Sequence, residues 1–183
     1  MIHLTSDLHM FHDRAFIYGP RGFKSVQTMM DYYKQEWLGN VAKQDDIYIV
    51  GDFCLGTDYD AIEQLVKSLS GNKHLLIGNH DTDAKVDFYK SLGMDVKYAD
   101  VIEYKKRRFY LSHFITHVAS LESNPDTCLI NLHGHLHTKE KFHEDIPYLY
   151  NVSMDANNNK IITLDNVLDA FQAKVSECIE LLK

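Results

Sequence analysis

Three short apolar runs in the first half of the chain are separated by segments long enough for helices, and this order limits the possible folds. The runs cover residues 2–5, 47–50 and 73–77, and each predicts a buried strand. Between them, apolar side chains recur at helical spacing over residues 26–41 and 62–69. A strand, helix, strand, helix, strand order predicts parallel strands joined by crossover helices.

The second half of the chain predicts hairpins and a long terminal helix. Residues 95–104 and 107–112 are strand-like runs around a tight Lys105-Lys106 turn. An apolar stripe over residues 164–182 predicts an amphipathic helix that packs on a sheet. Crossover units combined with hairpins favour two mixed sheets packed face to face with helices outside, in a single domain of residues 1–183. Further strands are expected at residues 128–132, 148–154 and 161–163, the last two separated by an Asn157-Asn158-Asn159 turn.

Charge and cysteine content exclude several classes of protein. A net charge of −7 argues against attraction to duplex nucleic acid, and the short basic run at residues 105–108 is better explained as a solvated turn. The three cysteines, Cys54, Cys128 and Cys178, are widely spaced and predict no disulfide framework. With no basic-then-apolar leader and no apolar run of membrane-spanning length, we expect a cytoplasmic protein without a membrane partner. Nothing in the pattern indicates an oligomeric state.

The turn Gly78-Asn79-His80-Asp81 follows the third predicted strand and carries three side chains that can bind metal or transfer protons. On its own it has an ordinary explanation, a strand-to-helix turn in which Asp81 or Asp83 caps the next helix. A functional role is favoured over this ordinary explanation because polar clusters rich in histidine and aspartate also follow the other predicted strands.

Candidate metal ligands therefore lie at several strand ends, where side chains far apart in the sequence can converge. Carboxylate, imidazole and amide ligands without thiolate suit Mn, Fe, Zn or Ni. The candidates exceed the roughly four protein ligands of one such site, so they predict two metals that share one carboxylate. Asp52 is the expected bridge because it stands alone in its cluster. The clusters are Asp7 with His9, Asp52, Asn79 with His80, His113, and His135 with His137.

The motifs D-x-H, G-D, G-N-H-D, S-H and G-H-x-H, in this order and at this spacing, resemble those of the calcineurin-like metallophosphoesterase superfamily. The likeness runs from Asp7 to His137. Beyond it, Asn151-Val152-Ser153-Met154-Asp155-Ala156-Asn157-Asn158 is similar to the N-V-x-x-D-x-N tail of small stand-alone bacterial and bacteriophage members. The resemblance implies a four-layer α/β/β/α sandwich, which agrees with the two mixed sheets flanked by helices already predicted.

The resemblance also implies a role for each motif residue. It assigns Asp7, His9 and His137 to one metal and Asn79, His113 and His135 to the other, with Asp52 bridging. His80 matches a histidine that is not a ligand and would protonate the leaving oxygen as general acid, while a metal-bridging hydroxide attacks phosphorus in line. We therefore expect a dinuclear metal-dependent phosphoesterase with two divalent ions, Mn before Fe, Zn or Ni, acting on a phosphodiester or small nucleotide.

Several residues near the motifs have weaker assignments as substrate contacts. His12 matches a histidine common in the small members and either faces the substrate or lies on the surface. Asn79 and Arg14 are further candidates, because a polar or cationic group close to the metals suits a phosphate. Arg14 and Arg21 are each better explained, taken separately, as ordinary surface arginines.

Other residues have open or structural interpretations. His133 either lines the pocket or belongs to a strand interior, and Asp155 and Asn157 either shape the pocket or hold a turn. Cys54 is better explained as a small core residue than as a nucleophile. The remaining histidines fit no motif and are interpreted as structural: His3, His74, His117 and His143.

Alternatives within and outside enzymology stay open. Phe53-Cys54-Leu55-Gly56 follows the G-D motif in place of D-R-G, which argues against a protein phosphatase. A phosphomonoesterase or a nuclease of the same fold is one alternative, although the acidic balance and the lack of a basic, aromatic-studded groove argue against a nuclease. A metal-binding interaction scaffold without catalysis is a further alternative, and the presence of His80 argues against it. Selectivity would lie in residues 11–22, 117–126 and 138–147.

Overall fold

The first half of the chain builds a five-stranded sheet in which four strands run parallel. The computed structural model describes residues 1–116, 129–143 and 146–181. The strand order is β10-β1-β2-β3-β4, with β10 antiparallel to β1. The crossover prediction is therefore confirmed. The strands are β1 (Ile2–Thr5), β2 (Asp46–Ile49), β3 (Asn72–Leu76), β4 (Asp95–Lys97) and β10 (Ile162–Thr163).

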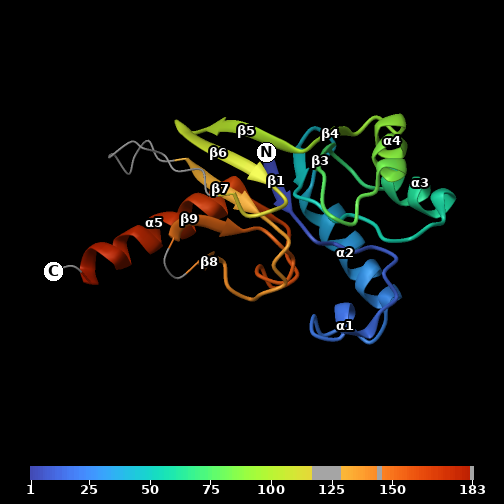
Figure 1. Cartoon of the computed structure of the whole chain (residues 1–183), viewed down its shortest axis with the longest axis horizontal. Helices are drawn as coiled ribbons and strands as arrows, with labels where there is room; N and C mark the ends of the chain where they lie inside the picture. Colours follow the sequence, from blue (N-terminus) through green and yellow to red (C-terminus); the bar gives the residue numbers. More distant parts are fainter. Residues whose placement is uncertain (117–128, 144–145, 182–183) are drawn as a thin grey trace.

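Helices cover one face of this sheet, namely α2 (Val26–Asn40), α3 (Tyr59–Ser68) and α4 (Asp83–Ser91) (Figure 1). Alternate residues of β2 explain the layering, because successive side chains of a strand point to opposite faces. Ile47 and Ile49 join the helix-side core, while Tyr48 joins the core shared with the second sheet.

Capping residues set the starts of helices α2 and α4. Ser25 forms a capping box with Thr28 at the start of α2. The N-cap of α4 is Thr82, without a side-chain hydrogen bond, so neither Asp81 nor Asp83 caps this helix. Asp81 is buried instead and accepts hydrogen bonds from backbone N–H groups of the strand-end turns.

The second sheet has the order β5-β6-β7-β9-β8 and is also mixed, with parallel β6, β7 and β9 and antiparallel strands at its edges. The predicted hairpin is confirmed between β5 and β6, and Lys105 and Lys106 make its turn at φ values of 50° and 64°. The expected strand 95–104 divides at Tyr98, because β4 pairs in the first sheet and β5 in the second. The strands are β5 (Ala99–Tyr104), β6 (Arg107–Ser112), β7 (Ile130–His133), β8 (Phe142–His143) and β9 (Ile146–Asn151).

The predicted terminal helix is α5 (Leu164–Leu181), which contacts β9 of the second sheet and β10 and β1 of the first. Leu164, Val167 and Phe171 are buried in the core shared by both sheets. The short helix α1 (Ala15–Tyr18) and strand β8 were not predicted from the sequence. Two mixed sheets with flanking helices confirm the expected α/β fold class. No helix in the described ranges is long and apolar enough to span a membrane.

Candidate metal centre

Side chains from five strand ends meet at the carboxyl edges of the two sheets. Asp7 and His9 follow β1, Asp52 follows β2, and Asn79 with His80 follows β3. The second sheet contributes His113 after β6 and the pair His135 and His137 after β7. All of the candidate ligands lie in one cluster, as predicted for side chains that follow the carboxyl ends of neighbouring strands.

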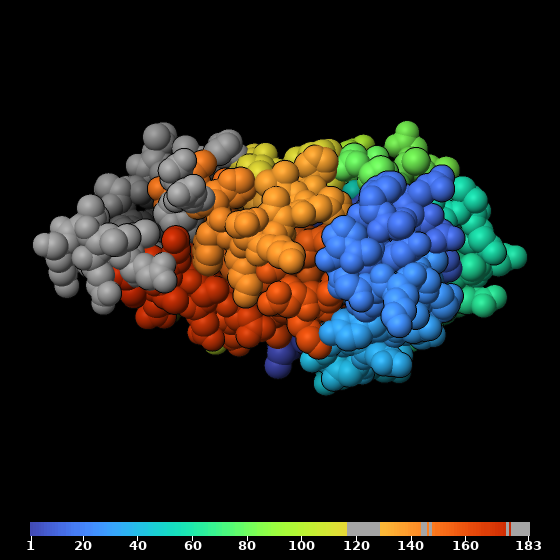
Figure 2. Space-filling model, turned by 90° about the horizontal axis from the view of Figure 1, so that it is seen from below, coloured from blue at the N-terminus to red at the C-terminus, as the bar shows by residue number. Residues whose placement is uncertain are grey.

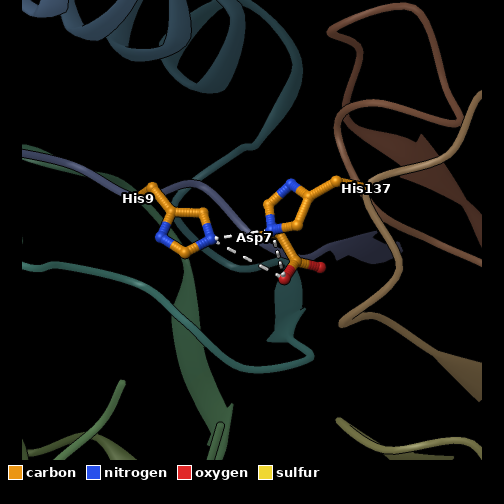
Figure 3. A group of neighbouring side chains, drawn as sticks. All are labelled: Asp7, His9 and His137. Carbon is orange, nitrogen blue, oxygen red and sulfur yellow. Dashed lines mark hydrogen bonds and ion pairs between the residues drawn. The ribbon is translucent and has the colours of Figure 1, made fainter. Parts of the chain in front are cut away.

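The first group consists of Asp7, His9 and His137 (Figure 3). The Nε2 atoms of His9 and His137 are 3.2 Å apart. Asp7 Oδ1 lies 3.9 Å from His9 Nε2 and 3.8 Å from His137 Nε2. Two nitrogens each about 2.1 Å from one ion lie about 3.0–3.4 Å apart. The three atoms therefore have the spacing of ligands around one cation, with modest adjustment for the carboxylate.

Asp7 provides an observation that supports a cation at this position. Its Oδ2 accepts hydrogen bonds from Ser6 Oγ at 2.6 Å and from the backbone N–H of His135 at 3.0 Å. Its Oδ1 is buried and has no hydrogen-bond donor among the described residues. Burial raises the pKa of the Asp7 carboxyl, against the opposing effect of neighbouring histidines such as His113. An unpaired buried carboxylate oxygen is costly unless a cation compensates it, so the donor set fits a metal ion.

The second group consists of Asn79, His113 and His135. Asn79 Oδ1 lies 3.0 Å from His113 Nε2 and 2.9 Å from His135 Nδ1. The other ring nitrogen of His113, Nδ1, lies 2.9 Å from the carbonyl oxygen of Val50 and donates to it, which leaves Nε2 with a free lone pair. One amide oxygen and two imidazole nitrogens therefore converge beside the first group.

Asp52 lies between the two groups. Its Oδ2 is 3.7 Å from His9 Nε2 and 3.6 Å from His113 Nε2. Its Oδ1 accepts a hydrogen bond of 2.9 Å from the backbone N–H of His80. The side chain is 2% exposed, so the carboxylate is held in one orientation with the same oxygen facing both groups.

Three glycines allow the cluster to pack. A Cβ at Gly51 would overlap the His113 ring, one at Gly78 would overlap the Asp52 carboxylate, and one at Gly134 would overlap Ser6 Oγ and the Asp7 carboxylate. The backbone at the centre is also strained, because several ligand candidates adopt the left-handed conformation. Such residues cost about 1–3 kcal/mol each and cluster at functional sites. They are Asp7, His9, Asp52 and His135, with φ values of 57°, 50°, 54° and 68°.

His80 and His12 lie beside the first group without belonging to it. The His80 ring centroid is 5.5 Å from that of His9, in an edge-on arrangement, and 6.5 Å from that of His12. The His12 ring is 5.6 Å from the His9 ring. Burial lowers the pKa of His9 to about 2 and, with the His80 charge, also lowers that of His12. His9 is therefore neutral, as a metal ligand must be.

Two further residues, Arg21 and Asp155, contact the first group. Asp155 Oδ2 lies 2.9 Å from His137 Nδ1. Arg21 Nε and Nη2 donate to the two Asp155 oxygens at 2.9 and 2.6 Å. The surface-arginine interpretation of Arg21 is wrong, because the residue is only 7% exposed. Arg14 is exposed at the N-cap of α1, and its role in substrate binding stays a prediction.

The remaining candidates are placed outside the cluster. His133 lies fully buried in β7, which confirms the strand-interior interpretation, and burial lowers its pKa to about 4. Asn157 holds a turn, because its amide donates to the carbonyl oxygens of Asn151 and Ser153. Cys54 is a buried core residue, and burial raises the pKa of its thiol. His117 and Cys128 lie outside the described residues.

Three side chains that support the site were not predicted from the sequence. Ser6 orients Asp7, Asp81 ties the Asp52 turn to the Gly78 turn through hydrogen bonds of 2.8 and 2.9 Å, and Arg21 holds Asp155. Ser6 directly precedes the motif residue Asp7, and Asp81 is the last residue of the G-N-H-D motif, so the motifs themselves were an available signal for both. Arg21 has no such signal, because its partner is distant in the sequence.

Comparison with known proteins identifies the family. The profile of the calcineurin-like phosphoesterase family matches residues 1–171, so this chain belongs to that family. A protein of unknown function from Aquifex aeolicus has a similar structure, at 23% identity and a TM-score of 0.69, over 93% of this chain and 98% of its own. At that identity the likeness shows the fold alone. An archaeal phosphodiesterase (15% identity, TM-score 0.46, 83% of this chain and 81% of its own) and the E. coli phosphoesterase YfcE (18%, 0.42, 83% and 77%) are more distant. No curated protein sequence matches.

Proposed function

We propose that this protein is a dinuclear metal-dependent phosphoesterase whose substrate is a phosphodiester or a small nucleotide. The observation that carries the proposal is the position of Asp52 Oδ2, 3.7 Å from His9 Nε2 and 3.6 Å from His113 Nε2. One carboxylate oxygen equidistant from two groups of ligand atoms is the arrangement expected of a bridge between two ions.

The ions would be held by the two groups described above. Asp7, His9 and His137 would hold one ion, Asn79, His113 and His135 the other, and Asp52 both. Oxygen and imidazole donors without thiolate favour Mn, with Fe, Zn or Ni as alternatives. When bound, two such ions supply Lewis acidity toward phosphate oxygens and a water of lowered pKa.

The chain's own groups would orient the substrate and move the proton. His80 is exposed at the edge of the cluster, and its backbone N–H is fixed by Asp52 Oδ1. It would donate a proton to the leaving oxygen of the ester. His12, beside His80, and Asn79 are the proposed substrate contacts, together with Arg14.

The chemistry of the surroundings favours a small substrate. The protein's net charge of −7 repels a long polyanion, whereas a single phosphodiester group carries only one negative charge and is repelled less. Phosphodiester and small-nucleotide substrates are therefore proposed ahead of nucleic acid duplexes.

The test compares hydrolysis of bis-p-nitrophenyl phosphate and p-nitrophenyl phosphate by protein stripped of metal and resupplied with Mn²⁺. Metal-dependent turnover that is faster for the diester supports the proposal. Faster turnover of the monoester would replace it with a phosphomonoesterase. Two bound ions without turnover of either ester would favour the interaction scaffold. The variant His74→Ala, which replaces a partly exposed histidine in the middle of β3 that belongs to neither ligand group, controls for nonspecific effects.

A further inference from the structure

Asp155 and Arg21 connect three distant parts of the chain to the metal centre. Arg21 follows α1, His137 follows β7, and Asp155 follows β9. Figure 2 shows the segment with α1 and α2, in blue, directly against residues 130–160, in orange to red-orange. The Asp155 carboxylate lies between the other two side chains, 2.9 Å from His137 Nδ1 and 2.6 Å from Arg21 Nη2.

This contact selects one tautomer of His137. A carboxylate 2.9 Å from Nδ1 is stabilised only if Nδ1 carries the proton, because two acceptors at that distance repel each other. Arg21 Nη2 is also near Nδ1, at 3.3 Å, but it is farther away and already donates to Asp155. With the proton on Nδ1, the lone pair is on Nε2. That nitrogen faces Asp7 Oδ1 and His9 Nε2 (Figure 3).

Arg21 fixes the carboxylate in turn. Its guanidinium binds Asp155 with both a 2.9 Å and a 2.6 Å hydrogen bond, a planar fork that lysine cannot reproduce. The same Nη2 donates to the backbone carbonyl oxygen of Asp7 at 2.8 Å. The arginine therefore joins the support of His137 to the backbone of a second candidate ligand, and it neutralises a carboxylate that would otherwise add charge next to Asp7.

We propose that Asp155 and Arg21 are positioning residues that hold His137 in the Nδ1–H tautomer with Nε2 directed at the first ion, and so set the occupancy of that metal position. The proposal rests on the proposed function for the ion itself, whereas the tautomer is a property of the metal-free chain. The second group has a different arrangement, because both ligand histidines there face Asn79 Oδ1 and neither contacts Asp155.

The chain offers a matched control. At the opposite edge of the first sheet, Asp45 also pairs with a histidine and a cation: His3 Nε2 lies 3.1 Å from Oδ2, and the N-terminal ammonium lies 2.6 Å from Oδ1. Asp45→Asn therefore removes the same kind of contact without touching the metal centre. Asp155→Asn and Asp45→Asn should both fold, and thermal unfolding of each metal-free variant checks this.

The experiment measures two quantities, bound Mn²⁺ per chain by elemental analysis with titration, and the His137 tautomer by long-range ¹H–¹⁵N spectra of the metal-free protein. We expect Asp155→Asn to bind one of the two ions about 10–100-fold more weakly, the usual effect of losing a residue that orients a metal-binding histidine. We expect His137 in that variant to lose its Nδ1–H signature. Arg21→Lys should retain more of the affinity than Arg21→Gln, since lysine keeps the charge.

Asp45→Asn should bind both ions as the wild type does. Wild-type affinity for both ions in Asp155→Asn, or an Nε2–H tautomer in the wild-type protein, would overturn the inference. An equal loss of affinity in Asp45→Asn would overturn it too, because the effect would then come from general destabilisation. If the wild type binds two ions and hydrolyses no ester, the proposed function fails while the positioning role of Asp155 stands.

Discussion

The two edges of the first sheet both contain aspartate and histidine side chains, but the aspartate carboxylates have different partners at the two edges. At the amino edge, the N-terminal ammonium lies 2.6 Å from Asp45 Oδ1 and His3 Nε2 lies 3.1 Å from Oδ2. At the carboxyl edge, Asp7 Oδ1 has no hydrogen-bond donor among the described residues. The Nε2 atoms of His9 and His113 lie 3.7 and 3.6 Å from Asp52 Oδ2.

The difference shows what distinguishes a candidate metal centre from ordinary ion pairing. Histidine and aspartate are present at both edges, so composition alone does not separate them. At the amino edge a protein cation, the N-terminal ammonium, lies beside Asp45. At the carboxyl edge Arg21 is bound to Asp155, while the inward-facing oxygens of the buried Asp7 and Asp52 have no cation bound to them in the part of the chain that the structure describes. Positive charge is therefore missing beside these two oxygens, and a divalent ion would supply it.

The largest effect should follow replacement of the shared carboxylate. We expect Asp52→Asn to lose at least one ion and to reduce phosphodiester hydrolysis by more than about 100-fold, since loss of a ligand exceeds the effect of losing a supporting residue. Metal analysis and steady-state kinetics measure this. The control variant Asp46→Asn, at the amino edge, should keep both ions. If Asp52→Asn also kept both ions, the carboxylates at the two edges would not differ in metal binding and the prediction would be wrong.

Replacement of His80 should separate catalysis from metal binding. We expect His80→Ala to keep two ions and to slow hydrolysis of esters with poor leaving groups by about 10²–10⁴-fold, because such groups need protonation. Esters with p-nitrophenolate as leaving group should be affected less. The measurement is the ratio of kcat/KM values for alkyl and nitrophenyl diesters, and a loss of metal in His80→Ala would contradict the role as proton donor.

The packing around Asp7 should be sensitive to one added carbon. In Gly134→Ala the new Cβ would overlap Ser6 Oγ, so we expect weaker metal binding and a free energy of unfolding lower by about 1–3 kcal/mol. Gly39→Ala in α2 is the matched control, because nothing lies within 4 Å of its Cβ position. Chemical denaturation should show it stabilised by up to about 1 kcal/mol. Equal stability changes in both variants would mean that the centre is not tightly packed.

The smallest effect concerns pH and the amino edge. Hydrogen bonds from the N-terminal ammonium, Ala42 N–H and His3 lower the pKa of Asp45 below its usual 3.8. A lowered pKa in the folded state contributes stability that is present above the unfolded-state pKa and is lost as pH falls through the folded-state pKa. The stability difference between wild type and Asp45→Asn should therefore be constant near pH 6 and shrink below about pH 4. A difference that does not change with pH would rule out this ion pair as a source of stability.

Local patterns predicted most of the fold. The apolar run at residues 47–50 predicted the buried strand β2, and helical spacing over residues 26–41 predicted α2. The division of residues 95–104 at Tyr98 could not be read, because β-strand patterning is the same in either sheet and pairing depends on distant partners. The role of Asp81 could not be read for a related reason, since a carboxylate that caps a helix and one that binds a neighbouring turn look identical in sequence.

The candidate ligands could be predicted because each follows a strand, and parallel strands bring their ends together. The residues that support these ligands were harder to predict, and Arg21 shows why. Arg21 belongs to no periodic element, and the partner that explains its burial lies 134 positions later. A single sequence carries no sign of such a pair until the fold places it.

The pairing of β1 with β10 has a consequence for biosynthesis. His3 is in register with Thr163, so β1 receives its second neighbour only after the intervening segments have been synthesised. The first group of candidate ligands is likewise complete only when His137 has been made, long after Asp7. At a synthesis rate of about 5–20 residues per second, many seconds pass between the synthesis of Asp7 and that of His137. An ion held as proposed would therefore bind only after His137 has been synthesised, and its identity would depend on the metals available to the chain at that stage.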